Sequence, residues 1–278
     1  MTEDSITETL RLPRQFGRLP GYGAAGIVRR PWPRPAQAAG SVRGWCCECV
    51  DQNPAVAWDE AAAPYILLEP EWNVWRSLPR AAARRRWMRG RVAAKDAVRL
   101  LLLDRYSVVA PLEAICVIPN ERGQPQVSCV AVPETGTWIS VSISHCGNGS
   151  VALAAERSKF CRGVGIDVAS QTDNHDGLAE GGFASAETAL LAGCPKSKRT
   201  DWLLCLWCAK EAAGKALGSG LMGNPLSLVV RHVNRTRGTV EIETNTDGEP
   251  AAPSDGPTRI LARVGCGRGM AFAVARLE

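Results

Sequence analysis

Glu211 and Lys215 stand four residues apart in the segment T-D-W-L-L-C-L-W-C-A-K-E-A-A-G-K-A-L-G-S-G, which runs from Thr200 to Gly220. On a helix, this spacing places a carboxylate and an ammonium group one turn apart on the same face. Such a pair has two interpretations. It is either a surface ion pair that contributes little to stability, or half of a site that holds a metal ion and a phosphate.

The segment itself predicts one helix. Thr200 is expected as its N-cap and Gly218 as its C-terminal stop. Lys210 lies about 100° around the helix from Glu211, so its role stays open. Apolar residues at helical spacing predict the side that faces the core, formed by Leu203, Leu206, Ala213 and Leu217.

Asp167 lies in the middle of an apolar segment, C-R-G-V-G-I-D-V-A, from Cys161 to Ala169. The alternation predicts a strand on which Asp167 points away from the valine and isoleucine side chains. Aspartate is disfavoured in strands and is rarely buried unless it is paired. Asp167 is therefore a candidate metal ligand, and a hydrogen-bonded structural aspartate is the alternative.

Ser144 and His145 end the segment W-I-S-V-S-I-S-H, in which apolar residues and serines alternate. This alternation predicts a half-buried strand, and the following C-G-N-G predicts a turn into a second strand. Ligand-binding groups are commonly presented beside such turns. The alternative is a hydroxyl and an imidazole that only satisfy the turn.

A basic helix is expected from about Ser77 to Asp104, with an apolar stripe through Trp87 and Val98. Its cations nearly encircle one end and would repel one another unless an anion neutralises them. This favours phosphate binding by some of them over a merely solvated face. The cations are Arg84, Arg85, Arg86, Arg89, Arg91, Lys95 and Arg99.

The chain has 278 residues, 45% of them hydrophobic, and a formal net charge of +5, which is ordinary for a globular protein that favours anionic ligands. No apolar run reaches the roughly 18 residues that span a bilayer. The acidic start lacks an apolar signal region, so we expect a cytoplasmic protein.

The 11 cysteines are expected as reduced thiols. A zinc site joining Cys46 and Cys49 with Cys205 and Cys208 is the alternative.

Strands and helices alternate twice along the chain, which predicts an α+β fold. We expect an irregular Gly/Pro/Arg-rich extension at 1–58, a first half at 59–158 and a second half at 159–278, with no sequence repeat between the halves. A short strand is expected at Tyr65–Leu68. Further strands are expected at 226–231, 239–243, 259–264 and 270–276.

Four motifs in this order resemble those of the 4′-phosphopantetheinyl transferase superfamily, and more narrowly its broad-specificity, single-chain type. They are S-I-S-H-C-G-N-G-S-V-A-L-A-A, G-V-G-I-D-V, F-A-S-A-E and W-C-A-K-E-A-A-G-K-A-L-G-S-G-L. The segments G-R-V-A-A-K and R-G-Q-P fit the same pattern. The resemblance covers about Pro64 to Glu278.

The resemblance implies a pseudo-dimer of two similar α+β halves with the active site in the cleft between them. It implies an Mg²⁺-dependent enzyme that moves 4′-phosphopantetheine from coenzyme A to a serine of an apo acyl or peptidyl carrier protein, releasing 3′,5′-ADP. We expect a monomer that binds neither nucleic acid nor membrane. The carrier and its pathway are not legible in the sequence.

By the same resemblance, Asp167 and Glu211 would hold the metal, and Glu211 would also accept the serine proton. Lys215 would act in catalysis by neutralising the pyrophosphate. The 3′-phosphate of coenzyme A would be held by Ser144, His145, Arg86 and Arg91, with Lys95 as a further candidate.

Two positions depart from the family pattern. Gln124 stands where the family often has a basic residue that contacts phosphate. Ala169 stands where many members have a second acid, two residues after the strand aspartate; a water molecule there is compatible with Mg²⁺, and weaker metal binding is the other outcome. This departure motivates the alternative of a non-catalytic, carrier-binding or regulatory relative. A basic nucleic-acid-binding protein is the third hypothesis, and no recognised motif supports it.

Overall fold

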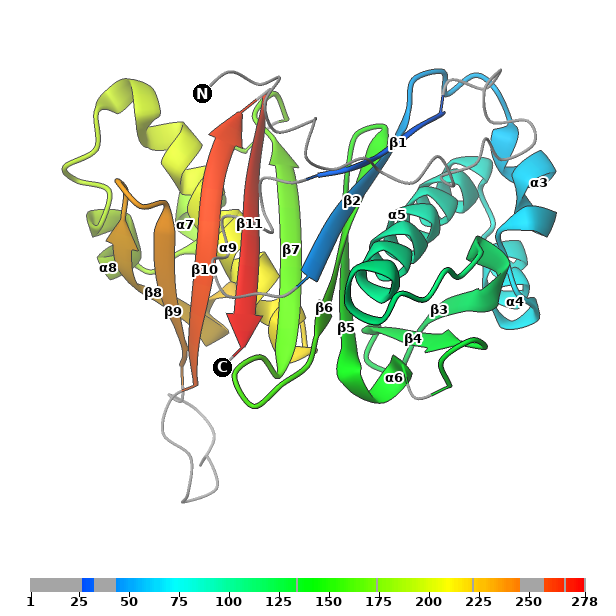
Figure 1. Cartoon of the computed structure of the whole chain (residues 1–278). Helices are drawn as coiled ribbons and strands as arrows, with labels where there is room; N and C mark the ends of the chain where they lie inside the picture. The colour runs from blue at the N-terminus through cyan, green and yellow to red at the C-terminus, as the bar shows by residue number, and fades with distance from the viewer. Residues whose placement is uncertain are drawn as a thin grey trace, which may run out of the picture.

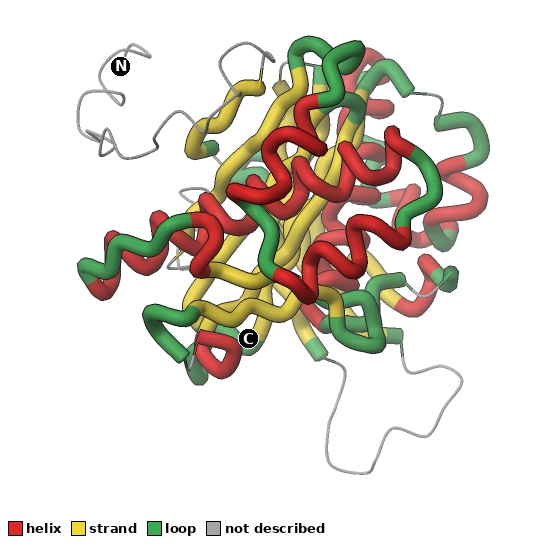
Figure 2. Tube along the Cα trace, turned by 90° about the vertical axis from the view of Figure 1, so that its right-hand side faces the viewer, coloured by secondary structure: helices red, strands yellow, loops and turns green. Residues whose placement is uncertain are grey.

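Two long helices, α5 (Ala81–Tyr106) and α9 (Lys196–Leu217), each cover one face of an antiparallel sheet (Figure 1). They are seen in a computed structural model that describes residues 27–32, 44–133, 135–173, 175–221, 223–245, 258–267 and 269–277. Figure 2 shows helices in front of the strands on the side facing the viewer. The α+β fold predicted from the sequence is confirmed at this level.

The first sheet has the strand order β1-β2-β6-β5, and α5 packs on β2, β5 and β6. Its strands are β1 (Ile27–Pro31), β2 (Gly44–Asp51), β5 (Ile139–Cys146) and β6 (Gly149–Glu156). A separate hairpin is formed by β3 (Ile115–Pro119) and β4 (Pro125–Cys129). The shorter helices are α3 (Trp58–Ala62), α4 (Glu69–Ser77) and α6 (Thr135–Trp138), with 3-10 turns at Ala63–Tyr65 and Leu112–Ala114.

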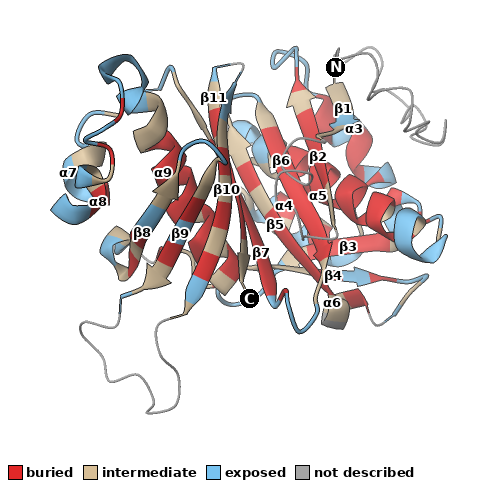
Figure 3. Cartoon of the chain, turned by 60° about the vertical axis from the view of Figure 1, so that its left-hand side comes forward, coloured by how far each residue is buried: buried red, intermediate tan, exposed pale blue. Residues whose placement is uncertain are grey.

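The second sheet has the strand order β7-β11-β10-β9-β8, and α9 packs mainly on β7, β11 and β10. Its strands are β7 (Gly163–Ser170), β8 (Leu228–Asn234), β9 (Thr239–Thr244), β10 (Arg259–Gly267) and β11 (Met270–Leu277). The short helices α7 (Leu178–Gly182) and α8 (Ser185–Ala189) precede α9, and a 3-10 turn at Pro225–Ser227 follows it. Figure 3 shows buried residues along the central strands and long helices, whereas α7 and α8 carry more exposed ones.

Several local predictions were wrong. Strands β1 and β2 lie inside the segment expected to be an irregular extension, and β2 pairs with β6 of the first sheet; residues 1–26 and 33–43 lie outside the described part of the chain. No strand forms at Tyr65–Leu68, where a 3-10 turn leads into α4. Helix α9 begins at Lys196, so Thr200 is not its N-cap, while Gly218 ends it in the left-handed conformation (φ 80°), as predicted.

A buried ion pair anchors the long helix of the first sheet. Lys95 on α5 donates to Glu71 Oε2 at 2.7 Å, and both side chains are fully buried. Glu71 also accepts the backbone N–H groups of Leu68 at 3.0 Å and Val117 at 2.9 Å. Lys95 donates a further hydrogen bond to the carbonyl of Ile66. All these groups therefore find partners away from water.

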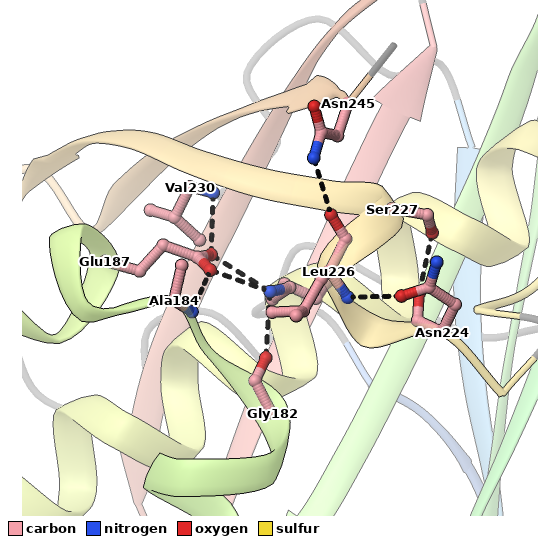
Figure 4. A network of polar contacts seen from close by, with 9 residues as sticks. Gly182, Ala184, Glu187, Asn224, Leu226, Ser227, Val230 and Asn245 are labelled. Carbon is pink, nitrogen blue, oxygen red and sulfur yellow. Dashed lines mark hydrogen bonds and ion pairs between the residues drawn. The ribbon is translucent and has the colours of Figure 1, made fainter. Parts of the chain in front are cut away.

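The same contacts recur around α9 (Figure 4). Lys210 donates to Glu187 Oε1 at 3.0 Å and to the carbonyl of Gly182 at 2.9 Å. Glu187 accepts the backbone N–H groups of Ala184 at 2.8 Å and Val230 at 2.9 Å. In both halves the glutamate thus pairs with the lysine of the long helix. It also accepts two backbone N–H groups, one from the residue three positions before it and one from the first strand after the long helix.

The two anchors lie at comparable places along the chain. Matching the lysines aligns A-K-D-A at Ala94–Ala97 with A-K-E-A at Ala209–Ala212. Apart from additional short helices and 3-10 turns, the elements follow in the same order around both anchors: a strand (β2 or β7), a short helix (α4 or α8), the long helix, and four strands. Asp96 and Glu211 therefore occupy corresponding places on their helices.

Three serines of β5 join the two sheets. The hydroxyls of Ser140, Ser142 and Ser144 accept hydrogen bonds from the N–H groups of β7 residues 164, 166 and 168, at 3.3, 3.0 and 3.3 Å. Because β7 is an edge strand, these N–H groups face away from its own sheet. The predicted half-buried strand is confirmed, but its serine face is buried in the joint rather than solvated.

Helix α9 approaches β7 closely because Gly165 has no side chain. A Cβ atom built at Gly165 would lie 1.8 Å from the carbonyl oxygen of Ala212 on α9. We expect Gly165→Ala to lower the free energy of unfolding by about 1–3 kcal/mol or more, because the helix must move away from the strand. Urea denaturation followed by circular dichroism measures this loss.

Gly181→Ala is the matched control, because a Cβ atom there meets no atom within 4 Å. We expect its unfolding midpoint to stay at or above that of the wild type, since alanine favours helix. Equal midpoints for the two variants would contradict the close packing of α9 on β7.

Candidate functional site

Asp167 lies on the face of β7 that is covered by α9, and only 8% of the residue is exposed. Its Oδ1 atom accepts hydrogen bonds from Lys215 Nζ at 2.7 Å and from Ser144 Oγ at 2.8 Å. Lys215 also donates to the carbonyl of Ile166 at 3.0 Å. The structure therefore brings together three predicted site residues from β5, β7 and α9.

Glu211 completes this cluster from α9, one turn before Lys215. Its pKa is raised by burial and by the nearby charge of Asp167, and Lys215 opposes the rise. The ammonium group of Lys215 is paired with Asp167 and only partly offsets the rise in the pKa of Glu211, so the cluster favours an additional cation or a proton on Glu211. Cys208, which the sequence suggested only as part of an alternative zinc site, lies beside them, and burial followed by Asp167 raises the pKa of its thiol.

His145 lies at the end of β5, where its Nδ1 atom is 2.7 Å from Ser150 Oγ. The ring packs on α5 at Gly90, where a Cβ atom would lie only 2.6 Å from His145 Cε1. Burial, followed by the positive charges of Arg86 and Lys215, lowers the pKa of His145 to about 3. The imidazole is therefore neutral at physiological pH and faces positive charge, which favours an anionic ligand between these groups.

We expect His145 to stay neutral in the free protein down to about pH 4. Because its pKa is lower in the folded than in the unfolded state, its contribution to stability is present above about pH 6.5 and declines between about pH 6.5 and 3. Imidazole ¹⁵N chemical shifts over this range test the titration, with His145→Gln used to assign the signal. A midpoint near 6.5 for His145 would contradict this environment.

The predicted arginines lie in different surroundings. Arg86 is exposed, whereas Arg91 is 7% exposed and stacks on Trp87, with its guanidinium carbon 4.2 Å from the ring centre. Burial lowers the pKa of Arg91 to about 10. Arg89, which the sequence named only as one of the cations of the basic helix, is also buried and donates to the carbonyl of Gly147 in the turn after β5, at 3.4 Å. Among the described residues, the buried Nε atoms of Arg89 and Arg91 have no hydrogen-bond partner.

Lys95 and Lys210 do not belong to the site. Each is fully buried and held by the glutamate of its own half, Glu71 or Glu187. The suggestion that Lys95 binds phosphate is therefore wrong, and the open question about Lys210 is answered by a structural role. The sequence could not separate them from Lys215, because their partners lie 24 and 23 residues away.

The two departures from the family pattern lie at the edge of the cluster. A Cβ atom at Gly218, where α9 ends, would lie 2.9 Å from Gln124 Oε1, so the β3–β4 turn reaches the end of α9 near Lys215. Ala169 packs against the apolar core of the second half. It supplies no oxygen two residues after Asp167.

A magnesium ion fits this donor set only with help from a ligand. In the described ranges, no group of three or more His, Cys, Asp or Glu side chains could hold a metal ion. Mg²⁺ binds through one or two carboxylates, with phosphate oxygens and water completing its shell. Asp167 and Glu211 provide two carboxylates near each other, so the pair suits Mg²⁺ bound together with a phosphate. A zinc site from the two CxxC pairs finds no support, since Cys46 and Cys49 are buried free thiols.

Among the described helices, none combines the length and apolar character needed to cross a bilayer.

Residues 163–259 match the family model described as the 4′-phosphopantetheinyl transferase superfamily. The matched segment runs from β7 to the start of β10 and includes Asp167, Glu211 and Lys215. A comparison with curated proteins gives no significant match. The superfamily expected from the motifs is thus supported for this segment, while the narrower single-chain type is not resolved.

Proposed function

We propose that this chain is an active 4′-phosphopantetheinyl transferase that modifies a serine of an apo carrier protein with the phosphopantetheine arm of coenzyme A. The observation that carries the proposal is the cluster of Asp167, Glu211 and Lys215 inside the matched segment, next to the cationic surroundings of His145. Transfer of a phosphoryl group from a pyrophosphate to a serine hydroxyl mainly needs positioning and charge neutralisation, and this cluster suits both tasks.

In the reaction, the serine oxygen of the carrier forms a bond to the β-phosphorus of coenzyme A, and the pyrophosphate P–O bond breaks to release 3′,5′-ADP. Asp167 and Glu211 would hold Mg²⁺, which when bound neutralises phosphate charge. Glu211 takes the serine proton, and its raised pKa brings it closer to the operating range of a general base. Lys215 neutralises charge that develops on the leaving group.

The 3′-phosphate of coenzyme A is assigned to His145, Arg86 and Arg91, with Arg89 as an addition suggested by its unpartnered Nε atom beneath the β5–β6 turn. A bound phosphate would pair with charges that otherwise face one another across His145. The resemblance also gives Ser144 to this phosphate. Its hydrogen bond to Asp167 argues for a different role.

We further propose that the two halves form the pseudo-dimer of the broad-specificity, single-chain type, and that the protein works as a cytoplasmic monomer. The repeated anchors, Lys95–Glu71 and Lys210–Glu187, support the duplication. In the first half, Asp96 occupies the place on α5 that corresponds to Glu211 on α9. The Asp96 carboxylate accepts hydrogen bonds from Arg29 at 2.8 and 2.5 Å. Among the described residues, the Asp96 carboxylate is thus held by an arginine, whereas no arginine pairs with Glu211.

A second candidate is a non-catalytic relative that binds carrier proteins, and Ala169 is the observation that favours it. One assay separates the two: purified protein, coenzyme A, Mg²⁺ and a panel of apo carrier domains, followed by intact mass spectrometry. A mass gain equal to one phosphopantetheine group on the carrier supports the transferase. Binding of a carrier without any mass gain across the panel would establish the non-catalytic relative instead.

A further inference from the structure

Ser144 differs from the other two serines of the joint between the sheets. Like Ser140 and Ser142, it accepts an N–H group of β7, here from Val168 at 3.3 Å. It alone also donates its hydroxyl proton to Asp167 Oδ1, at 2.8 Å. We propose that Ser144 is a positioning residue, which aims the Asp167 carboxylate and couples it to the joint between the halves. This inference rests on the proposed transferase function.

The hydrogen-bonding capacity of a hydroxyl limits what else Ser144 can do. A serine has one proton to donate, and an anion such as phosphate needs a donor. That proton is already used by Asp167, and the residue is only 4% exposed. His145, the next residue, is therefore left to face the anion together with the arginines of α5.

Two bonds to one oxygen define how the Asp167 carboxylate is held. Ser144 approaches Oδ1 from β5, and Lys215 approaches the same atom from α9 at 2.7 Å. The carboxylate is thus fixed by both halves of the molecule. Partners that orient a metal-binding carboxylate typically change metal affinity or activity by about 10–100-fold when removed.

The test compares Ser144→Ala with Ser142→Ala, which removes an equivalent contact to β7 without touching Asp167. We expect both variants to lower the urea midpoint. Only Ser144→Ala should weaken Mn²⁺ binding by about tenfold or more and shift the Mg²⁺ dependence of kcat by a similar factor. Mn²⁺ binding is measured by electron paramagnetic resonance of the free ion with coenzyme A bound. Ser144→Thr, which keeps the hydroxyl, should restore most of the Mn²⁺ affinity and most of the wild-type Mg²⁺ dependence of kcat.

A second comparison separates positioning from phosphate binding. With 3′-dephospho-coenzyme A as substrate, the loss caused by Ser144→Ala should persist if Ser144 acts on Asp167. The inference is overturned if the loss disappears with this substrate, if only KM for coenzyme A rises, or if Ser142→Ala and Ser144→Ala behave alike. Absence of any turnover by the wild type would instead overturn the proposed function, and Mn²⁺ binding by the variants would still be measurable.

Discussion

Glu211→Gln is expected to lower kcat by about 10²–10⁴-fold while the protein stays folded, because the amide keeps the shape of the carboxylate but neither accepts the serine proton nor holds Mg²⁺ well. Glu211 lies one turn before Lys215 on α9, and burial and the nearby charge of Asp167 raise its pKa. Because the pKa of Glu211 is raised, kcat of the wild type should decline as the pH falls through that pKa. The measurement is kcat against pH with an apo carrier domain, with unfolding midpoints recorded in parallel.

The structure offers a matched control in the first half. Asp96 occupies the corresponding place in A-K-D-A, but Arg29 holds its carboxylate and the side chain is 2% exposed. We expect Asp96→Asn to lower stability and to leave kcat within a few-fold of the wild type. Full activity of Glu211→Gln, or an equal loss of kcat in both variants at temperatures where both are folded, would show that the site assignment is wrong.

Glu187→Ala is expected to lower the free energy of unfolding by about 3–5 kcal/mol, the usual cost of leaving a buried charge without its partner. Lys210 and Glu187 are both 0% exposed, so water does not replace the lost carboxylate. The variant also removes the acceptor for the N–H groups of Ala184 and Val230. Urea unfolding followed by tryptophan fluorescence and circular dichroism measures the loss.

Two further variants sharpen this result. Replacing the pair together, with Lys210→Met and Glu187→Leu, should recover part of the lost stability, because no buried charge remains. Glu71→Ala should cost a similar amount in the first half, since Glu71 makes the equivalent contacts. A loss below about 1 kcal/mol for both single variants would contradict the anchoring role of these buried pairs.

The first half was harder to predict than the second. Strands β1 and β2 lie in a segment rich in Gly, Pro and Arg, where no periodicity marks a strand. Strand β2 pairs with β6, about 100 residues further on, where Gly44 lies opposite Ala155, and β1 in turn pairs with β2. Helix α4 was also missed, because its start is fixed by Glu71, whose side chain bonds the N–H group of Leu68. A contact with Lys95 keeps that glutamate buried.

The sequence by itself determined the elements that carry the site. Strand β7 follows from the alternation around Asp167, and the spacing of Glu211 and Lys215 places both on one face of α9, because such periods depend only on local backbone geometry. The tertiary structure decided which charges are available. It buried Lys95 and Lys210 against glutamates from distant segments, and it paired the Asp96 carboxylate with Arg29. It also placed Ser144 on Asp167, because the partners of a polar side chain are set by the packing of whole sheets and helices.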